Sequence, residues 1–415
     1  MTKDDIIKAA FKVWGQDLYR TTSLTEIALN LGVSKTALYR HFRNKDALMD
    51  AMYGSFFDDC ADFIREGFKE AFNTSDKQKM YIILFRTVTE YFVRNRYAFA
   101  FFLIKASRRK DGPNVHDEFC GRGIDFDHPA LAEFSDFPST TQLGMITLIF
   151  YTANFHHRNL GEEYTPDDQE VKGILKETED VISNGLSLNR QIIDALNYLE
   201  LEERAGRIVH EDTEENVLLR AVAAAVAEAG PWNASMEMVS KHSGLSKSGL
   251  YAHFKNKQDM IAQLFVTELT KIANHAKIQV ESSCVSEEQL YLAIISIINY
   301  LRARPEILEA IDWIKTRKLN LGKNVSGYLS RIIGDIKIEA IQNYDRHKLV
   351  QIAQWVLFMI VNALALWRYP ENQKMANQEN VGWDVSWSRN LAEIPNESFR
   401  KLFRFIALGL GGSHL

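Results

Sequence analysis

The chain has 415 residues, of which 46% are hydrophobic and 25% are charged; this composition is typical of soluble proteins with several compact domains and excludes disordered and fibrous chains. Its longest apolar stretches, MITLIFY from Met145 and WVLFMIV from Trp355, fall well short of the ~20 residues that cross a bilayer, and the acidic start MTKDD is unlike a secretory leader. We therefore expect a cytoplasmic protein with no membrane partner.

The first predicted elements are two helices that occur in each half of the chain. Apolar residues follow helical spacing at Ile6, Ile7, Ala10, Phe11 and Trp14, and again at Val217, Leu218, Val222, Ala225 and Val226. A second helix is expected after Ser23, where SLTE has the form of a capping box with Glu26. In the later copy Ser235 can cap in the same way, but Met238 stands in place of the glutamate.

A glycine turn and a short third helix follow each pair. The turn glycines are Gly32 and Gly244, the predicted caps of the third helix are Ser34 and Ser246, and those of the fourth helix are Asn44 and Asn256. This order predicts a three-helix unit of the helix-turn-helix type.

The third helix lies in a segment that the chain contains twice. GVSKTALYRHFRNK at residues 32–45 returns as GLSKSGLYAHFKNK at residues 244–257, displaced by 212 positions, with nine of the fourteen residues identical. The two segments carry four and three basic residues and no acidic residue, although the whole chain has a net charge of −5. A period of this length indicates two fused subunits, and the two basic patches suit localised contact with phosphate.

The remaining chain reads as helix, with no convincing strand pattern. FYTANF at 150–155 parallels FMIVNA at 358–363, and ISNGL at 182–186 parallels IALGL at 406–410. Residues 189–213 form a helical or charged connector, which would reach ~37 Å if it were one continuous helix. The predicted fold class is therefore all-α.

Together with the preceding segments TSLTEIALNL and ASMEMVSKHS, the two basic segments resemble the TetR family of bacterial transcription regulators. The resemblance implies two TetR-like units, each with a helix-turn-helix headpiece and a helical regulatory domain, packed as an intramolecular pseudo-dimer. It also implies a four-helix interface, at about 142–160 and 167–188 against 346–368 and 395–411. The expected domains are headpieces at 1–47 and 214–259, regulatory domains at 48–188 and 260–415, and the connector at 189–213.

A helix that enters the major groove needs short side chains at its start and polar side chains that reach bases and phosphates. The leading turns are Lys35, Thr36 and Ala37 in the first copy and Lys247, Ser248 and Gly249 in the second. The resemblance implies DNA contacts for Tyr39, His41, Tyr251 and His253, while Lys45 and Lys257 would bind phosphate at a helix N-terminus. The predicted set also includes Ser23, Ser34, Arg40, Ser235 and Ser246, whereas Phe42 and Phe254 are expected to point into the core.

Other candidate sites have weaker support. The aromatic residues Phe85, Tyr91, Phe92, Phe99 and Phe102 suggest the wall of an apolar ligand pocket, but ordinary helix packing explains them equally well. His116, Cys120 and His128 share a loop-like stretch, for which a structural role is favoured over metal binding, and adjacent His156 and His157 cannot readily hold one metal. Cys60, Cys120 and Cys284 predict reduced thiols.

The sequence therefore predicts a DNA-binding transcriptional regulator. It would act as a ligand-responsive repressor on an imperfectly palindromic operator, with an unknown small-molecule effector and no cofactor or metal. One chain would be a monomer that acts as a pseudo-dimer. The alternative is a ligand-binding or protein-interaction module whose DNA contacts have decayed. An enzyme is disfavoured, because no catalytic constellation rises above chance.

Overall fold

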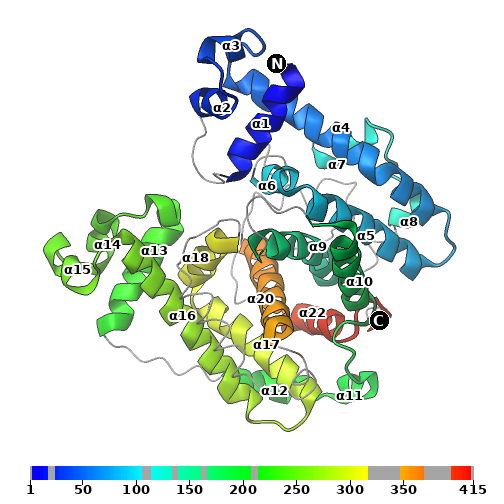
Figure 1. Ribbon diagram of the computed structural model, residues 1–415. Helices are drawn as coiled ribbons and strands as arrows, with labels where there is room; N and C mark the ends of the chain where they lie inside the picture. The colour runs from blue at the N-terminus through cyan, green and yellow to red at the C-terminus, as the bar shows by residue number, and fades with distance from the viewer. Residues whose placement is uncertain are drawn as a thin grey trace. The chain divides into compact units, whose positions relative to one another are not determined.

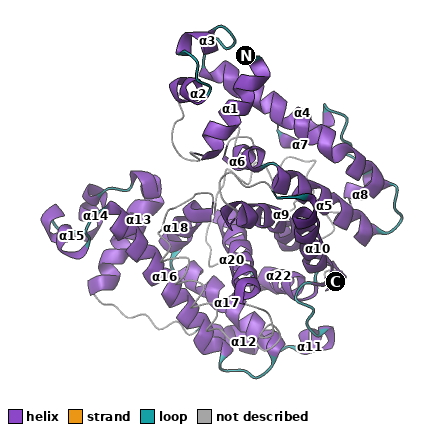
Figure 2. Ribbon diagram, in the orientation of Figure 1, coloured by secondary structure: helices purple, strands orange, loops and turns teal. Residues whose placement is uncertain are grey.

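The computed structural model describes residues 2–16, 24–104, 114–132, 139–159, 166–206, 214–315, 346–368 and 394–412. Within these ranges the regular structure is helical and contains no strand, as Figure 2 shows. The all-α prediction is confirmed. No helix in the described part of the chain is both long enough and apolar enough to cross a membrane.

The chain divides into two compact units, with boundaries that pass through the helices α9 (Ser139–Asn159) and α10 (Asp168–Asn184). Unit 1 comprises Met1–Phe134 and Leu148–Asp180, and unit 2 comprises Ser135–Thr147, Val181–Lys315 and Leu319–Leu415. The helices from the N-terminus to α10 are α1 (Lys3–Gln16), α2 (Leu24–Asn30), α3 (Lys35–Tyr39), α4 (Lys45–Phe72), α5 (Lys77–Arg94), α6 (Arg96–Ile104), α7 (Val115–Cys120), α8 (Pro129–Ala132), α9 (Ser139–Asn159) and α10 (Asp168–Asn184) (Figure 1).

The helices that follow belong to unit 2. They are α11 (Arg190–Ala195), α12 (Tyr198–Ala205), α13 (Glu214–Asn233), α14 (Met236–Ser243), α15 (Lys247–His253), α16 (Lys257–Val280), α17 (Ser286–Ala303), α18 (Pro305–Lys315), α20 (Arg346–Arg368) and α22 (Asn396–Leu408). A short 3₁₀ helix at Leu410–Gly412 ends the described chain.

The sequence repeat is also a repeat of packing. In the first copy α1 packs on α4 and on α2, and α2 packs on α3; in the second copy α13 packs on α16 and on α14, and α14 packs on α15. Buried positions recur 212 residues apart, as the pairs Ile27 and Val239, Leu38 and Leu250, and Leu48 and Met260 show. Each half therefore contains one headpiece with its own apolar core.

The predicted caps hold the short helices of both headpieces. Serine Oγ atoms accept hydrogen bonds from Ala37 N–H in α3 (Ser34, 3.2 Å), Gly249 N–H in α15 (Ser246, 3.1 Å) and Met238 N–H in α14 (Ser235, 3.3 Å). Ser23 lies outside the described residues, so the capping box predicted there is untested. The turn residues Gly32 and Gly244 have φ values of +64° and +74°, which favour glycine. A Cβ atom would meet nothing within 4 Å at either position, so backbone conformation, not space, explains these glycines.

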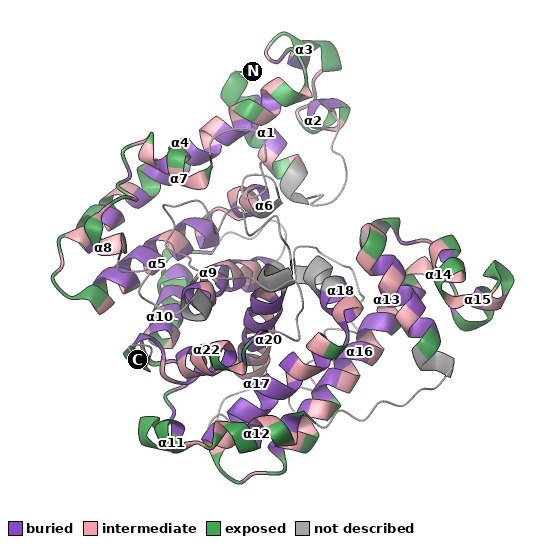
Figure 3. Ribbon diagram, turned by 180° about the vertical axis from the view of Figure 1, so that it is seen from behind, coloured by how far each residue is buried: buried purple, intermediate pink, exposed green. Residues whose placement is uncertain are grey.

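The longer helices of each unit pack against one another and supply many of its buried side chains. In unit 1, α4 packs along α5 and α1 packs on α6; in unit 2, α16 packs along α17 and α13 packs on α18. Figure 3 shows that α17 is buried along most of its length. The same two pairs of packed helices thus occur in both units.

The connector is not one continuous helix, so the length worked out for a single helix does not apply. The helix α11 ends at Ala195, the backbone at Leu196 is extended, and α12 begins at Tyr198. Both short helices are held within unit 2: Asp194 pairs with Arg404 at 2.6 Å, and Glu202 pairs with Arg400 at 2.7 Å. Residues 207–213 of the predicted connector lie outside the described residues.

Within unit 2, equivalent glycines of the two copies meet. Gly185 and Gly409 occupy the same place in ISNGL and IALGL, and both have positive φ, at +57° and +61°. A Cβ on Gly185 would lie 2.6 Å from the nitrogen of Gly409, and a Cβ on Gly409 would lie 2.6 Å from the nitrogen of Asn184. The Leu186 N–H donates to the carbonyl of Ile406 at 2.9 Å. Reciprocal contact between equivalent elements is the pattern of a two-fold interface.

The start of α9 packs on α20 and α22 in the same unit. A Cβ on Gly144 would lie 2.7 Å from the ring of Phe405 and 3.3 Å from the sulfur of Met359, and Asn362 donates to Thr147 Oγ1 at 3.0 Å. Only glycine allows this close approach of helices from the two halves of the sequence.

Candidate nucleic-acid interface

In the first headpiece, α3 presents the predicted DNA-binding side chains on its surface. Ser34, Lys35, Thr36, Tyr39 and Arg40 are exposed, and Ala37 and His41 are half-buried. Behind them Leu38 is 1% exposed and holds α3 on the headpiece core, and Phe42 is buried as predicted. A helix with a buried apolar anchor and a free polar face can enter a groove without unfolding.

The second headpiece presents the matching residues on α15. Ser246, Lys247, Ser248, Tyr251 and His253 are exposed, and Ser235 and Gly249 are half-buried. Leu250 and Phe254 are the buried anchors. Tyr251 is 58% exposed and Tyr39 is 45% exposed, so both rings lie on the surface beside the polar side chains.

The two helices differ in the electrostatic surroundings of their first lysine. Lys247 Nζ lies 3.0 Å from Glu237 Oε2 of α14. The position equivalent to Glu237 in the first copy is Thr25, and Lys35 Nζ lies 5.8 Å from the centre of the Tyr39 ring. A carboxylate therefore partly neutralises the leading lysine in the second headpiece.

Lys45 and Lys257 begin the long helices α4 and α16, and both are half-buried. One N–H group of each helix end is already occupied, because the side chains of Asn44 and Asn256 accept from Ala47 N–H and Asp259 N–H, each at 2.8 Å. Burial also lowers the pKa of Lys257.

The aromatic residues predicted as a ligand wall pack against one another in unit 1. Phe85, Tyr91, Phe92 and Phe99 are buried, and Phe102 is half-buried. The ring of Phe92 lies 5.6 Å from that of Phe99 and 5.3 Å from that of Phe102. Tyr91 also donates a hydrogen bond to Asp59 Oδ2 at 3.0 Å. Mutual packing thus accounts for much of the cluster, which was the alternative explanation from the sequence.

Neighbouring residues of α6 connect this cluster to the first headpiece. The ring of Phe101 lies 5.0 Å from Phe11 of α1 and 5.1 Å from Tyr53 of α4, while the ring of Phe102 lies 5.5 Å from Phe150 of α9. A shift of α6 would therefore change the packing of both the aromatic cluster and α1.

The positions of the histidines and of Cys120 agree only in part with the grouping expected from the sequence. His116 and Cys120 lie close together, but the third member of the cluster is Asp127, which the sequence reading did not include. His128 instead stacks on Phe72, with ring centres 4.0 Å apart. His157 is buried, and its Nε2–H donates to the Phe92 carbonyl at 2.7 Å. Burial lowers the pKa of His157 to about 4.

Comparison with known proteins connects both headpieces to one family. Residues 6–52 and 218–264 each match the family described as bacterial regulatory proteins, tetR family. The fatty acid metabolism regulator protein of Bacillus subtilis (strain 168) is 24% identical over 132 residues, which cover 30% of this chain and 67% of that protein. The two family matches are separated by the same 212 residues as the sequence repeat.

Proposed function

We propose a function from the premise that this chain belongs to the TetR family of bacterial transcription regulators and carries two copies of the family's DNA-binding domain. In this proposal, one chain forms a complete repressor that binds its operator through two headpieces. The observation that carries the proposal is the duplicated headpiece, with an exposed polar helix on a buried core in each copy. The reciprocal contact at Gly185 and Gly409 supports pairing of the copies within one chain.

Each recognition helix, α3 and α15, would lie in a major groove. Lys35 and Thr36, with Lys247 and Ser248, would reach base edges and phosphates, since these side chains are exposed in the first turn of the helices. Tyr39, His41, Tyr251 and His253 would contact the backbone beside the groove. Lys45 and Lys257 would bind phosphate and add affinity without sequence preference.

The operator would be an imperfect palindrome, because the two reading helices differ. Arg40 is exposed beside α3, whereas the equivalent Ala252 of α15 offers no polar group. Ala37 can pack against a thymine methyl group and Gly249 cannot. The half-sites would be related but unequal, with centres about one helical turn or a multiple apart.

The effector would be a compound with a long apolar portion that binds unit 1 near the aromatic cluster. The partial similarity to a fatty acid metabolism regulator supports a fatty acid or one of its derivatives. Binding between α5, α6 and α9 would move Phe101 and hence α1, since Phe101 contacts Phe11. A ligand releases DNA only if it binds better to the conformation whose heads no longer match the operator.

A mobility-shift assay at stated salt, with DNA from around the gene and with random DNA, tests the proposal. We expect specific binding by the wild-type chain and loss of that binding in the double variant Lys35→Ala, Lys247→Ala. Equal, weak binding to both DNAs would instead indicate a module whose DNA contacts have decayed. Fatty acids of increasing chain length, added to the specific complex, then test the effector separately.

A further inference from the structure

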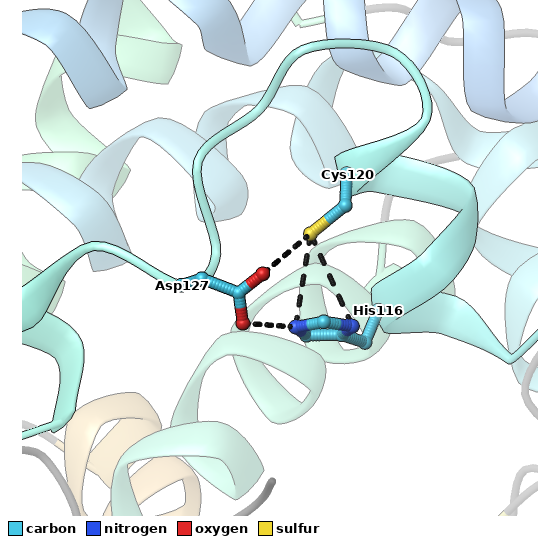
Figure 4. Close-up of side chains that lie close together, drawn as sticks. All are labelled: His116, Cys120 and Asp127. Atoms are coloured by element: carbon cyan, nitrogen blue, oxygen red, sulfur yellow. Dashed lines mark hydrogen bonds and ion pairs between the residues drawn. The ribbon is translucent and has the colours of Figure 1, made fainter.

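The loop that follows α7 brings three side chains with metal-binding atoms to one place in unit 1. His116 and Cys120 are four residues apart and so project from the same face of α7, and Asp127 reaches them from the loop, as Figure 4 shows. Their ligand atoms all lie within 4.8 Å of one another. We propose that His116, Cys120 and Asp127 bind zinc or a similar transition-metal ion as three protein ligands, with the fourth coordination position open.

The distances between the ligand atoms agree with a tetrahedral ion. His116 Nε2 lies 3.0 Å from Asp127 Oδ1 and 3.7 Å from Cys120 Sγ, and Cys120 Sγ lies 3.8 Å from Asp127 Oδ2. Around a tetrahedral zinc ion, ordinary bond lengths place nitrogen and oxygen ~3.3 Å apart and sulfur ~3.5 Å from either of them. The separations are therefore close to those around a bound ion, and rotation of the imidazole and the thiol about their side-chain bonds would complete the geometry.

The arrangement does not suit a thiol–imidazole–carboxylate relay. In such a relay the thiol and the carboxylate face opposite ring nitrogens. Here Asp127 contacts the same Nε2 that lies nearest to Cys120 Sγ. The sulfur is also 3.9 Å from Nδ1, so it lies over the face of the ring and not in line with either nitrogen (Figure 4). The sulfur and the carboxylate both lie nearest to Nε2, so one ion bound to that nitrogen could be shared by all three side chains after the imidazole rotates toward the sulfur.

The ligand types select the class of metal. A thiolate and an imidazole favour zinc and similar transition metals over magnesium and calcium, which prefer oxygen ligands. The second ring nitrogen, His116 Nδ1, lies 3.4 Å from Asp117 Oδ1. A carboxylate on the second nitrogen is the usual support for a metal-bound histidine, because it fixes the ring and its tautomer.

The surrounding contacts hold the three ligands in place on α4. Arg122, between Cys120 and Asp127, pairs with Asp58 of α4 at 2.6 Å, and its carbonyl accepts from Arg65 at 2.9 Å. The ring of Phe126, next to Asp127, packs 5.5 Å from Phe68 of α4. Metal binding would cross-link α7 to the loop and stiffen this face of the helix that begins at the first headpiece.

Zinc titration of untagged, chelator-treated, full-length protein against a chromophoric competitor tests the proposal. We expect one ion per chain and a loss of affinity of at least about tenfold in each of Cys120→Ser, His116→Gln and Asp127→Asn. Cys284→Ser, at an exposed cysteine of unit 2, is the matched control and should leave affinity unchanged. Cobalt(II) should give a tetrahedral visible spectrum with a thiolate charge-transfer band that Cys120→Ser abolishes.

The proposal is overturned if the wild-type chain binds no zinc above the level of Cys120→Ser, or if Cys284→Ser removes the cobalt thiolate band. Far-UV circular dichroism of the metal-free variants separates loss of a ligand from loss of fold. If Cys120→Ser fails to fold, the His116→Gln and Asp127→Asn titrations decide the question. Zinc should also raise the melting temperature of the wild-type chain and of Cys284→Ser, but not that of the three ligand variants.

Discussion

The ion pair between Lys247 and Glu237 should weaken DNA binding by the second headpiece. We predict that Glu237→Thr, which introduces the residue found at position 25 of the first copy, increases operator affinity. Lys247 must leave Glu237 to reach DNA, and the carboxylate repels phosphate. Both side chains are largely exposed, at 58% and 77%.

An exposed ion pair of this kind contributes ~0.2–1 kcal/mol. Its removal should therefore raise affinity by a factor of about 1.4 to 5 at low salt. The gain should shrink as salt rises, because the Debye length falls from ~10 Å at 0.1 M to ~3 Å at 1 M. The reverse change in the first headpiece, Thr25→Glu, should weaken binding by a similar factor by introducing the same pair with Lys35.

Fluorescence anisotropy with the selected operator, at several salt concentrations, measures both changes. Lys247→Ala is the necessary control and should weaken binding. The reasoning is refuted if Lys247→Ala weakens binding while Glu237→Thr leaves affinity unchanged at every salt concentration. Lys247 would then contact DNA without competition from its carboxylate partner.

Three further predictions concern phosphate contacts, pH dependence and the connector. Lys45→Ala and Lys257→Ala should each lower the salt slope of binding by about one unit without changing base preference, and a changed preference in a binding-site selection would contradict the phosphate role. Unit 1 should lose up to ~3 kcal/mol of its free energy of unfolding as pH falls from 6.5 to 4. The reason is that the pKa of buried His157 is lowered to about 4, so protonation of this histidine favours the unfolded chain. Urea unfolding of His157→Gln should show a smaller pH dependence than that of the wild-type chain. Glu202→Gln should destabilise unit 2 by ~1.5–3 kcal/mol in urea unfolding, because Glu202 accepts hydrogen bonds from Tyr291 and Arg400. An unchanged midpoint would show that these hydrogen bonds do not stabilise the unit.

Local patterns explain why the headpieces could be predicted closely. The caps Ser34, Ser246, Asn44 and Asn256 each accept from a backbone N–H three residues away, so sequence spacing determines their geometry. The turn glycines need only a positive φ, which is also a local property. Elements whose structure depends on interactions between neighbouring residues can therefore be predicted from a single sequence.

Features that depend on distant residues were missed. Nothing near Glu202 in the sequence indicates that Tyr291 and Arg400 hold it, so the sequence alone is compatible with one continuous helix. Asp127 joins His116 and Cys120 only because the intervening loop packs on α4. Glu237 pairs with Lys247 across a turn, and an alignment of the copies could have found this pair by the contrast with Thr25.

The central claim is that one chain supplies both reading heads. Light scattering of the purified complex with a short operator duplex measures the number of chains on the DNA. We predict the mass of one 47.6 kDa chain per duplex, with footprinting protection of two half-sites whose centres are ~34–36 Å apart or a multiple of that distance. Two chains per duplex, each protecting one half-site, would contradict the account.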